Sequence, residues 1–217
     1  MGYCEDVDLM VLEPGIFVEP ALASMRLLLG VSGVVSGTTL TISGASFVAA
    51  GVCGGMVAAL TTADNATTVT VEVVAVTDAT TATVSVVRAR DADAAVGPVV
   101  GGAVKVTVVS FRAQIAAVGD ELRRLLGGGT DRASGAAVPA MVELTDFRMA
   151  AAFGTLALIY RMLSSVTSPK ATVLSKMTVY TQAYGALRRS LKAKVDLDHD
   201  GVAETVVRAG VRKLERE

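Results

Sequence analysis

The chain has no tryptophan, one histidine and two cysteines, and only 4% of its residues are aromatic. Cys4 and Cys53 are too few for a disulfide framework and lack metal-ligand spacing, which favours two free thiols in a reducing compartment. The valine- and threonine-rich region before residue 110 has few aromatic side chains, and its later part has only Arg88, Arg90 and Lys105 as cations. This composition argues against a surface that stacks nucleic-acid bases.

Catalytic and phosphate-binding patterns are also missing. His199 has no cysteine or serine nucleophile of obvious geometry nearby. The glycine runs at 101–102 and 127–129 lack the lysine and the strand-to-helix context of a phosphate loop. We therefore expect a protein that is not an enzyme and has no cofactor.

Membrane and secretion signals are absent from the pattern as well. Residues 27–63 contain no charge, but glycine and threonine turns interrupt them, whereas a spanning helix needs about 20 continuous apolar residues. The apolar run 149–160 is bracketed by Arg148 and Arg161, at the length of a core helix. The acidic start MGYCEDVD differs from the positive start of a signal peptide. We expect no membrane association.

Charge is divided unevenly along the chain. Residues 1–109 carry four Lys/Arg and ten Asp/Glu, whereas residues 140–217 carry twelve and eight. Most of these charges are expected on solvated faces, but the division permits complementary contacts between copies or with a partner.

Residues 31–109 have the pattern of a small β domain. Leu40 and Ile42 alternate with threonine and serine, and Val69, Val71 and Val73 alternate with Thr68, Thr70 and Glu72. This period of two predicts strands with one buried face and one solvent-exposed face, and it places Glu72 on the exposed face. The segments at 33–37, 38–43, 56–62, 68–76, 81–89 and 104–109 together predict an antiparallel barrel or sandwich of about five to seven strands.

Helical periodicity dominates the rest of the chain. The N-terminal segment, broken by Pro14 and Pro20, predicts either two short helical turns or a helix and an extended arm. A stripe from Phe111 to Leu125 predicts a helix that ends at 127–129, and a second helix is expected from Pro139 to about Ser164. The third is expected from about residue 173 through Lys194, with an inward stripe of Met177, Tyr180, Tyr184, Leu187 and Leu191.

The expected fold is α+β. A helical bundle, made of the N-terminal segment and three C-terminal helices, occupies residues 1–30 and 110–204. The small antiparallel barrel or sandwich is an insertion at 31–109, and residues 205–217 form a C-terminal tail.

The acidic turn after the third helix has two interpretations. Asp196, Asp198, Asp200 and Gly201 have the spacing of the first half of a calcium loop, and Glu204 stands at its ninth position. The twelfth position is valine, where a bidentate glutamate is needed. A turn whose carboxylates cap a following helix, from Ala203 to about Leu214, is therefore preferred, and no metal site is assigned.

The stretch DFRMAAAFGTLALIYRML, the proline-containing link, the tyrosine-rich helix and DLDHDGVAE resemble the helical head-to-tail connector proteins of tailed bacteriophages. The start DVDLMVLEPGIF resembles the opening of such chains, whereas the inserted β region departs from the all-helical members.

This resemblance implies a structural virion protein of the neck, assembled in the host cytoplasm. Its partners would be the portal protein, a downstream neck or tail completion protein, and further copies of itself in a ring of about twelve that closes by rotation. Double-stranded DNA would pass through the lumen without sequence-specific contact. The basic tail would reach the portal through Arg208, Arg212, Lys213, Leu214 and Arg216.

A different class of function is also open. The chain could be a monomeric binding module in which the barrel recognises a carbohydrate or protein and the acidic turn takes up calcium weakly.

Overall fold

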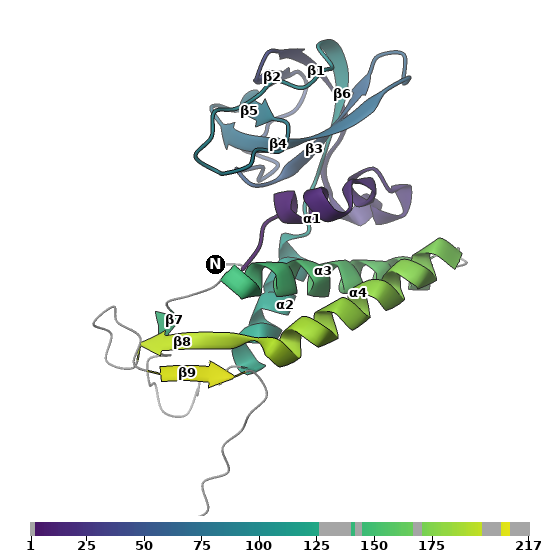
Figure 1. Ribbon diagram of the computed structural model, residues 1–217. Helices are drawn as coiled ribbons and strands as arrows, with labels where there is room; N and C mark the ends of the chain where they lie inside the picture. Colours follow the sequence, from purple (N-terminus) through teal and green to yellow (C-terminus); the bar gives the residue numbers. More distant parts are fainter. Residues whose placement is uncertain (1–2, 126–139, 142–144, 167–170, 197–204, 209–217) are drawn as a thin grey trace, which may run out of the picture. The chain divides into compact units, whose positions relative to one another are not determined.

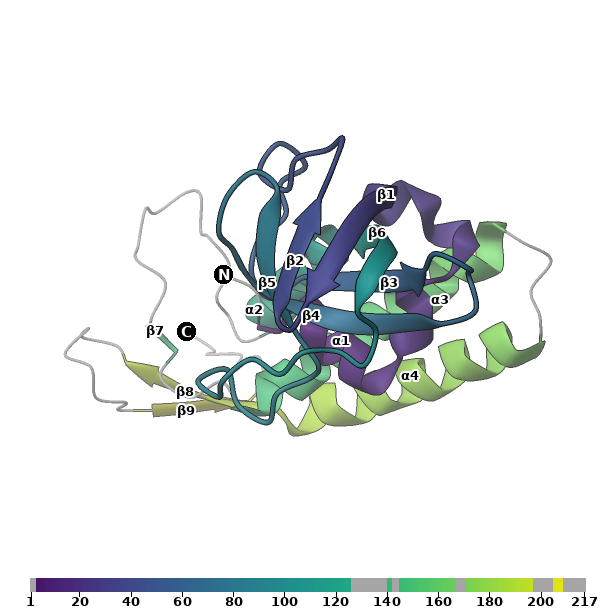
Figure 2. The ribbon, with the colours of Figure 1, turned by 90° about the horizontal axis from the view of Figure 1, so that it is seen from above.

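The computed structural model describes residues 3–125, 140–141, 145–166, 171–196 and 205–208. The chain divides into two compact units, one formed by residues 5–111 and the other by residues 1–4 and 112–217. The fold is α+β, and one unit contains a closed antiparallel barrel of six strands (Figures 1 and 2).

The barrel unit begins with three short helical segments, namely α1 (Asp6–Leu12), η1 (Pro14–Phe17) and η2 (Pro20–Met25). The strands follow in the order β1 (Arg26–Ser36), β2 (Thr39–Ile42), β3 (Val57–Thr62), β4 (Thr68–Val76), β5 (Thr81–Ser85) and β6 (Gly102–Val109). Around the barrel they pair as β1-β2-β5-β4-β3-β6, and β6 returns to β1. Register shifts on β1 and between β4 and β5 mark bulges, which bend strands and help a sheet to close.

Alternation of side chains builds the barrel interior. Leu40, Val71, Val73 and Val106 have no exposed surface, whereas Thr39 and its neighbours on the outer face lie in solvent. The predicted antiparallel barrel of about five to seven strands is confirmed, but β1 begins earlier than predicted, at Arg26, and β5 ends at Ser85 and not at residue 89.

Residues 5–25 belong to the barrel unit and pack against β3, although residues 1–30 were predicted in the helical domain. The ring of Phe17 meets that of Phe111 edge to face, with 5.3 Å between centroids. Buried Asp6 accepts a hydrogen bond from the backbone N–H of Phe111 at 2.8 Å. The barrel therefore interrupts the other unit after residue 4, because these aromatic and polar contacts tie the N-terminal segment to the end of β6.

The helical unit contains α2 (Arg112–Leu125), α3 (Thr145–Val166) and α4 (Ala171–Ser190). Helices α3 and α4 lie side by side, and α2 packs against α3 (Figures 1 and 2). The first predicted helix is confirmed, as Ile115, Val118 and Leu122 of its stripe are buried. The bundle with the N-terminal segment is not confirmed, because α1 belongs to the barrel unit.

A small sheet of β7 (Ala140–Met141), β8 (Lys192–Asp196) and β9 (Thr205–Arg208) corrects three predictions. The second long helix begins at Thr145 and not at Pro139, and α4 ends at Ser190 before Lys192 and Lys194. Residues 205–208, expected in a helix and in the tail, pair with β8 instead, Lys192 opposite Arg208. The β-branched residues Val195, Thr205, Val206 and Val207 favour this pairing.

Candidate interaction surfaces

The structure places only part of the site that the sequence predicts. Arg208 is the last residue of β9, and Arg212, Lys213, Leu214 and Arg216 lie outside the described residues. Asp196 ends β8, whereas Asp198, His199, Asp200 and Glu204 also lie outside them. In the described part of the chain, no three His, Cys, Asp or Glu side chains are grouped to hold a metal ion.

Glu72 is the polar residue that the sequence pattern misplaces. It projects from the outer face of β4, between the inward-facing Val71 and Val73, yet its residue is only 5% exposed. The reason is that the connection between β5 and β6, residues 86–101, folds back over this face; we call it the β5–β6 loop. The prediction of a solvent-exposed Glu72 is therefore wrong.

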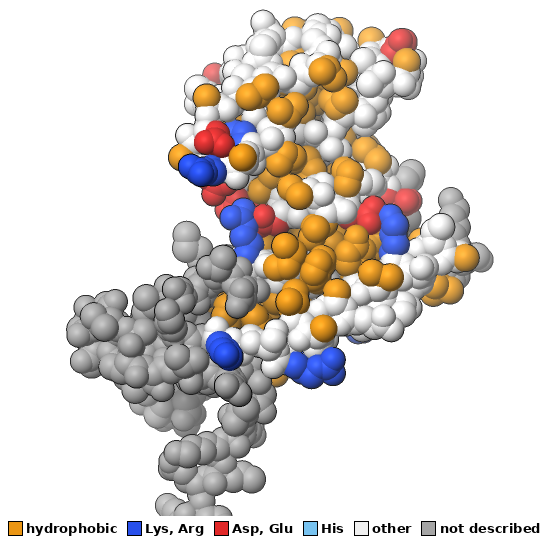
Figure 3. All heavy atoms as spheres, in the orientation of Figure 1, with side chains coloured by type: hydrophobic (Ala, Val, Ile, Leu, Met, Phe, Trp, Pro, Cys, Tyr) orange, Lys and Arg blue, Asp and Glu red, His pale blue; other side chains and the backbone are white. Residues whose placement is uncertain are grey.

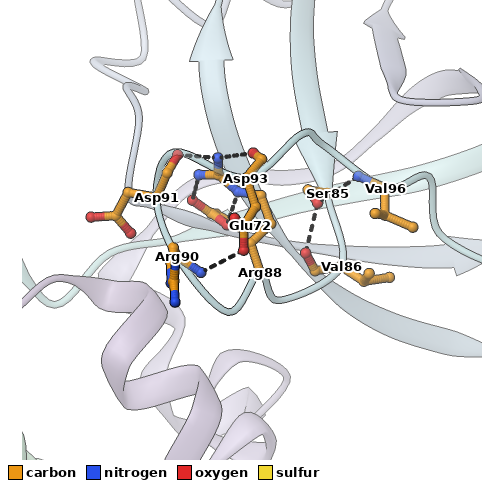
Figure 4. Close-up of polar contacts among 8 residues, drawn as sticks. All are labelled: Glu72, Ser85, Val86, Arg88, Arg90, Asp91, Asp93 and Val96. Atoms are coloured by element: carbon orange, nitrogen blue, oxygen red, sulfur yellow. Dashed lines mark hydrogen bonds and ion pairs between the residues drawn. The ribbon is translucent and has the colours of Figure 1, made fainter.

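Arg88 fastens this loop to the barrel through Glu72 (Figure 4). Its Nη2 donates to Glu72 Oε1 at 2.6 Å and its Nε donates to Oε2 at 3.1 Å, which is a bidentate ion pair. Its Nη1 donates to the backbone carbonyls of Asp91 and Asp93. The hydrogen bond to Glu72 raises the pKa of Arg88 further above its ordinary value, so the guanidinium stays charged.

A second anchor lies beside the first. Ser85 is the cross-strand partner of Glu72, is fully buried, and accepts a hydrogen bond from the N–H of Val96 at 2.9 Å. Further along the loop, a Cβ on Gly97 would lie 2.6 Å from the carbonyl oxygen of Gly37, so only glycine allows this close approach to the β1–β2 turn. The loop is thus held at three points and has one defined course.

The held loop exposes apolar side chains. Val99 is 93% exposed, Val96 55% and Val87 45%. Asp91 and Asp93 are also on the exposed side, and Figure 4 shows the Asp91 carboxylate turned away from the Arg88 guanidinium. In Figure 3 the part of the barrel near β5 carries charged side chains next to apolar ones. Loops of this length without secondary structure commonly serve binding.

The helical unit has a groove of about 290 Å³ between α2, α3 and α4. Its apolar wall is formed by Ala117, Val118, Gly154, Ala157 and Leu158. Gly154 makes room for the neighbouring helices, because a Cβ there would lie 2.7 Å from Val118 Cγ1 and 2.9 Å from Tyr184 Cε2.

Polar side chains also line this groove. Arg161, Thr181 and Tyr184 line it together with Glu121, which accepts an ion-pair hydrogen bond from Arg188 at 2.8 Å. The hydroxyl of Tyr184 is buried and interacts electrostatically with Glu121 and Arg188. Burial, and then the negative charge of Glu121, raise the pKa of Tyr184 to about 12, so this hydroxyl remains a donor at neutral pH.

Helix α4 is attached to its unit on one side only. Its inward stripe is half-buried, and Tyr180 stacks on Tyr160 of α3 with 5.6 Å between centroids. None of its twenty residues is fully buried, and Val179 and Leu174 are exposed. The outer face of α4 is therefore available for contact with another chain.

The fold and these surfaces define a two-unit α+β protein, in which a barrel carries a fastened loop and a helical unit carries a groove. Comparisons with protein-family models, curated proteins and solved structures found no match to this chain. No helix within the described ranges combines the length and apolar character needed to cross a membrane.

Proposed function

We propose that this chain is a structural subunit that assembles into a ring and joins the portal of a tailed bacteriophage to the neck or tail. The observation that carries the proposal is the exposed outer face of α4, a twenty-residue helix that buries no residue completely within one copy. Long helices in proteins draw most of their stability from packing. A neighbouring subunit would supply the packing that one copy leaves incomplete.

Assembly would rest on apolar contact more than on single ion pairs. Exposed pairs contribute only about 0–1 kcal/mol each. The opposite net charges of the two units would favour the correct approach of one copy to another. The portal would be bound by the basic C-terminal residues, which follow β9.

Co-sedimentation with portal rings tests this function. A chain that ends at Arg208 keeps β9 and its pairing with β8, whereas deletion from Thr205 would also remove that strand. We expect the chain ending at Arg208 to remain folded by circular dichroism and to lose portal binding. Unchanged co-sedimentation of this shortened chain would refute the role of the tail, and a full-length chain that never binds portal rings would refute the connector function.

The fastened β5–β6 loop favours a second candidate, a monomeric module whose barrel binds a carbohydrate or a protein. A mass in solution equal to one chain, with and without portal protein, would support this candidate. A large upward shift of the melting temperature at sub-millimolar calcium would support its calcium-binding turn.

A further inference from the structure

We propose that the β5–β6 loop of one copy inserts Val99 into the groove between α2, α3 and α4 of the next copy. This inference rests on the proposed function, since it names one contact between subunits of the ring, in addition to the outer face of α4. Its occupant is a second copy of this chain.

The β5–β6 loop is already ordered and presents exposed apolar side chains. Val99 is almost fully exposed at 93%, and Val96 is exposed beside it. The ion pair between Arg88 and Glu72 already fixes the course of the backbone. Binding by an ordered loop loses less conformational entropy than binding by a free one, so its apolar side chains are effective in a contact.

The groove has matching chemistry. Its apolar wall is lined by small side chains and by Leu158, and its volume of about 290 Å³ accommodates aliphatic side chains. Arg161 also lines it and can meet a carboxylate such as that of Asp91.

Charge supports a contact between unlike surfaces. The barrel unit, residues 5–111, has a formal charge of −6, and the rest of the chain has +5. Two copies that met through their barrel units would repel each other, whereas the barrel unit of one copy and the helical unit of another would attract each other. Such a contact is heterologous, so it leaves one loop and one groove open at the ends and closes only as a ring.

Two variants that block the contact, one in the loop and one in the groove, are each compared with a matched control; we call them the blocked variants. Val99→Asp places a charge at the tip of the loop, and Val48→Asp places one at a 63% exposed valine in the β2–β3 connection. Ala117→Trp covers the groove from an exposed position on α2, and Ala116→Trp adds the same side chain at an exposed neighbour that does not line the groove. Each variant is checked for an unchanged far-ultraviolet spectrum and melting temperature.

Sedimentation velocity over a range of protein concentrations gives the result. We expect the natural chain and both controls to associate, and each blocked variant alone to sediment as a monomer. A mixture of the Val99→Asp and Ala117→Trp chains should form a 1:1 dimer and nothing larger, because the pair retains one intact loop and one intact groove.

Three outcomes would overturn the inference: a natural chain that stays monomeric at the highest concentration, blocked variants that associate like the natural chain, or a mixture that forms no dimer. The last would indicate a contact within one chain or elsewhere on the surface. Portal co-sedimentation is scored separately. Chains that pass the mixing test but do not bind portal would refute the connector function alone, whereas portal binding with unaffected blocked variants would refute only this contact.

Discussion

At the scale of single residues, the ion pair of Glu72 with Arg88 joins the β5–β6 loop to β4. Both side chains lie under one layer of loop, at 7% and 8% exposure. An ion pair so placed contributes little relative to an apolar pair, but the loss of one partner leaves a desolvated charge. In this chain the ion pair fixes the course of the β5–β6 loop.

Substitution Glu72→Gln should release the loop while the barrel stays folded. We expect a loss of about 1–3 kcal/mol in the free energy of unfolding, because Arg88 loses its charged acceptor. Hydrogen exchange of the loop amides, including that of Val96, should become faster than in the natural chain. Denaturant unfolding and hydrogen exchange measure the two effects.

The double variant Glu72→Gln, Arg88→Met provides the control. It removes both charges, so we expect it to be more stable than the sum of the two single changes indicates. Additive losses would show that the two side chains act independently, contrary to the observed bidentate geometry.

Tyr184 should titrate later than an ordinary tyrosine. Its pKa is about 12 in the folded chain and 10.0 in a free side chain, so the unfolded chain ionises first. Any stability linked to this group is complete below pH 10 and is lost as the pH rises towards 12. Absorbance of tyrosinate measures the titration.

Tyr184→Phe should remove the latest component of that absorbance titration. The Tyr3→Phe chain is the comparison, since burial also raises the pKa of Tyr3 but Arg123 opposes the shift. Circular dichroism at each pH confirms that the chain is still folded. An unchanged late component in Tyr184→Phe would disprove the assignment.

At the scale of helices and strands, two glycines give opposite expectations. Gly154 of α3 faces Val118 and Tyr184, whereas a Cβ on Gly185 of α4 would meet nothing within 4 Å. The first glycine serves the packing of three helices, and the second only weakens its own helix.

Gly154→Ala should destabilise the chain by about 1–3 kcal/mol, because the added methyl group forces neighbouring side chains to move. Gly185→Ala should stabilise it by about 0.5–1 kcal/mol through helix propensity. Thermal unfolding of the two chains is the measurement. Equal increases in melting temperature for both variants would mean that the side chains around Gly154 can move to accept the added methyl group without loss of stability.

The helices and strands also differ in how well the sequence predicts them. The barrel strands and α2 could be predicted because each has its own local period, as in Leu40 and Ile42 or Ile115 and Val118. The sheet of β7, β8 and β9 could not, because its strands are short and β7 pairs with a strand that is distant in sequence, Ala140 lying opposite Asp196.

The interaction surfaces were harder to predict than the elements. Glu72 is buried by a loop whose arginine lies sixteen residues away, and no local pattern near Glu72 contains that information. The groove likewise needs three helices to be packed before it exists. A charged residue flanked by buried valines, followed by an arginine in a long loop, was the available signal.

At the scale of the whole molecule, the boundary of the barrel unit can be tested directly. Residues 5–111 contain all six strands together with α1, Phe17 and Phe111. The sequence-based boundary, 31–109, would cut β1 between Arg26 and Ser36 and would remove both aromatic rings. The two boundaries therefore make different physical predictions.

A chain of residues 5–111 should fold alone. Its apolar core, the N-terminal segment packed on the barrel, and the hydrogen bond from Phe111 to Asp6 are all internal to it. We expect cooperative thermal unfolding and a dispersed amide NMR spectrum. A chain of residues 31–109 should show neither, since the loss of residues 26–30 leaves Val108 and Val109 of β6 without their partners on β1. Cooperative unfolding of the shorter chain would show that the N-terminal segment merely covers a barrel that is complete without it.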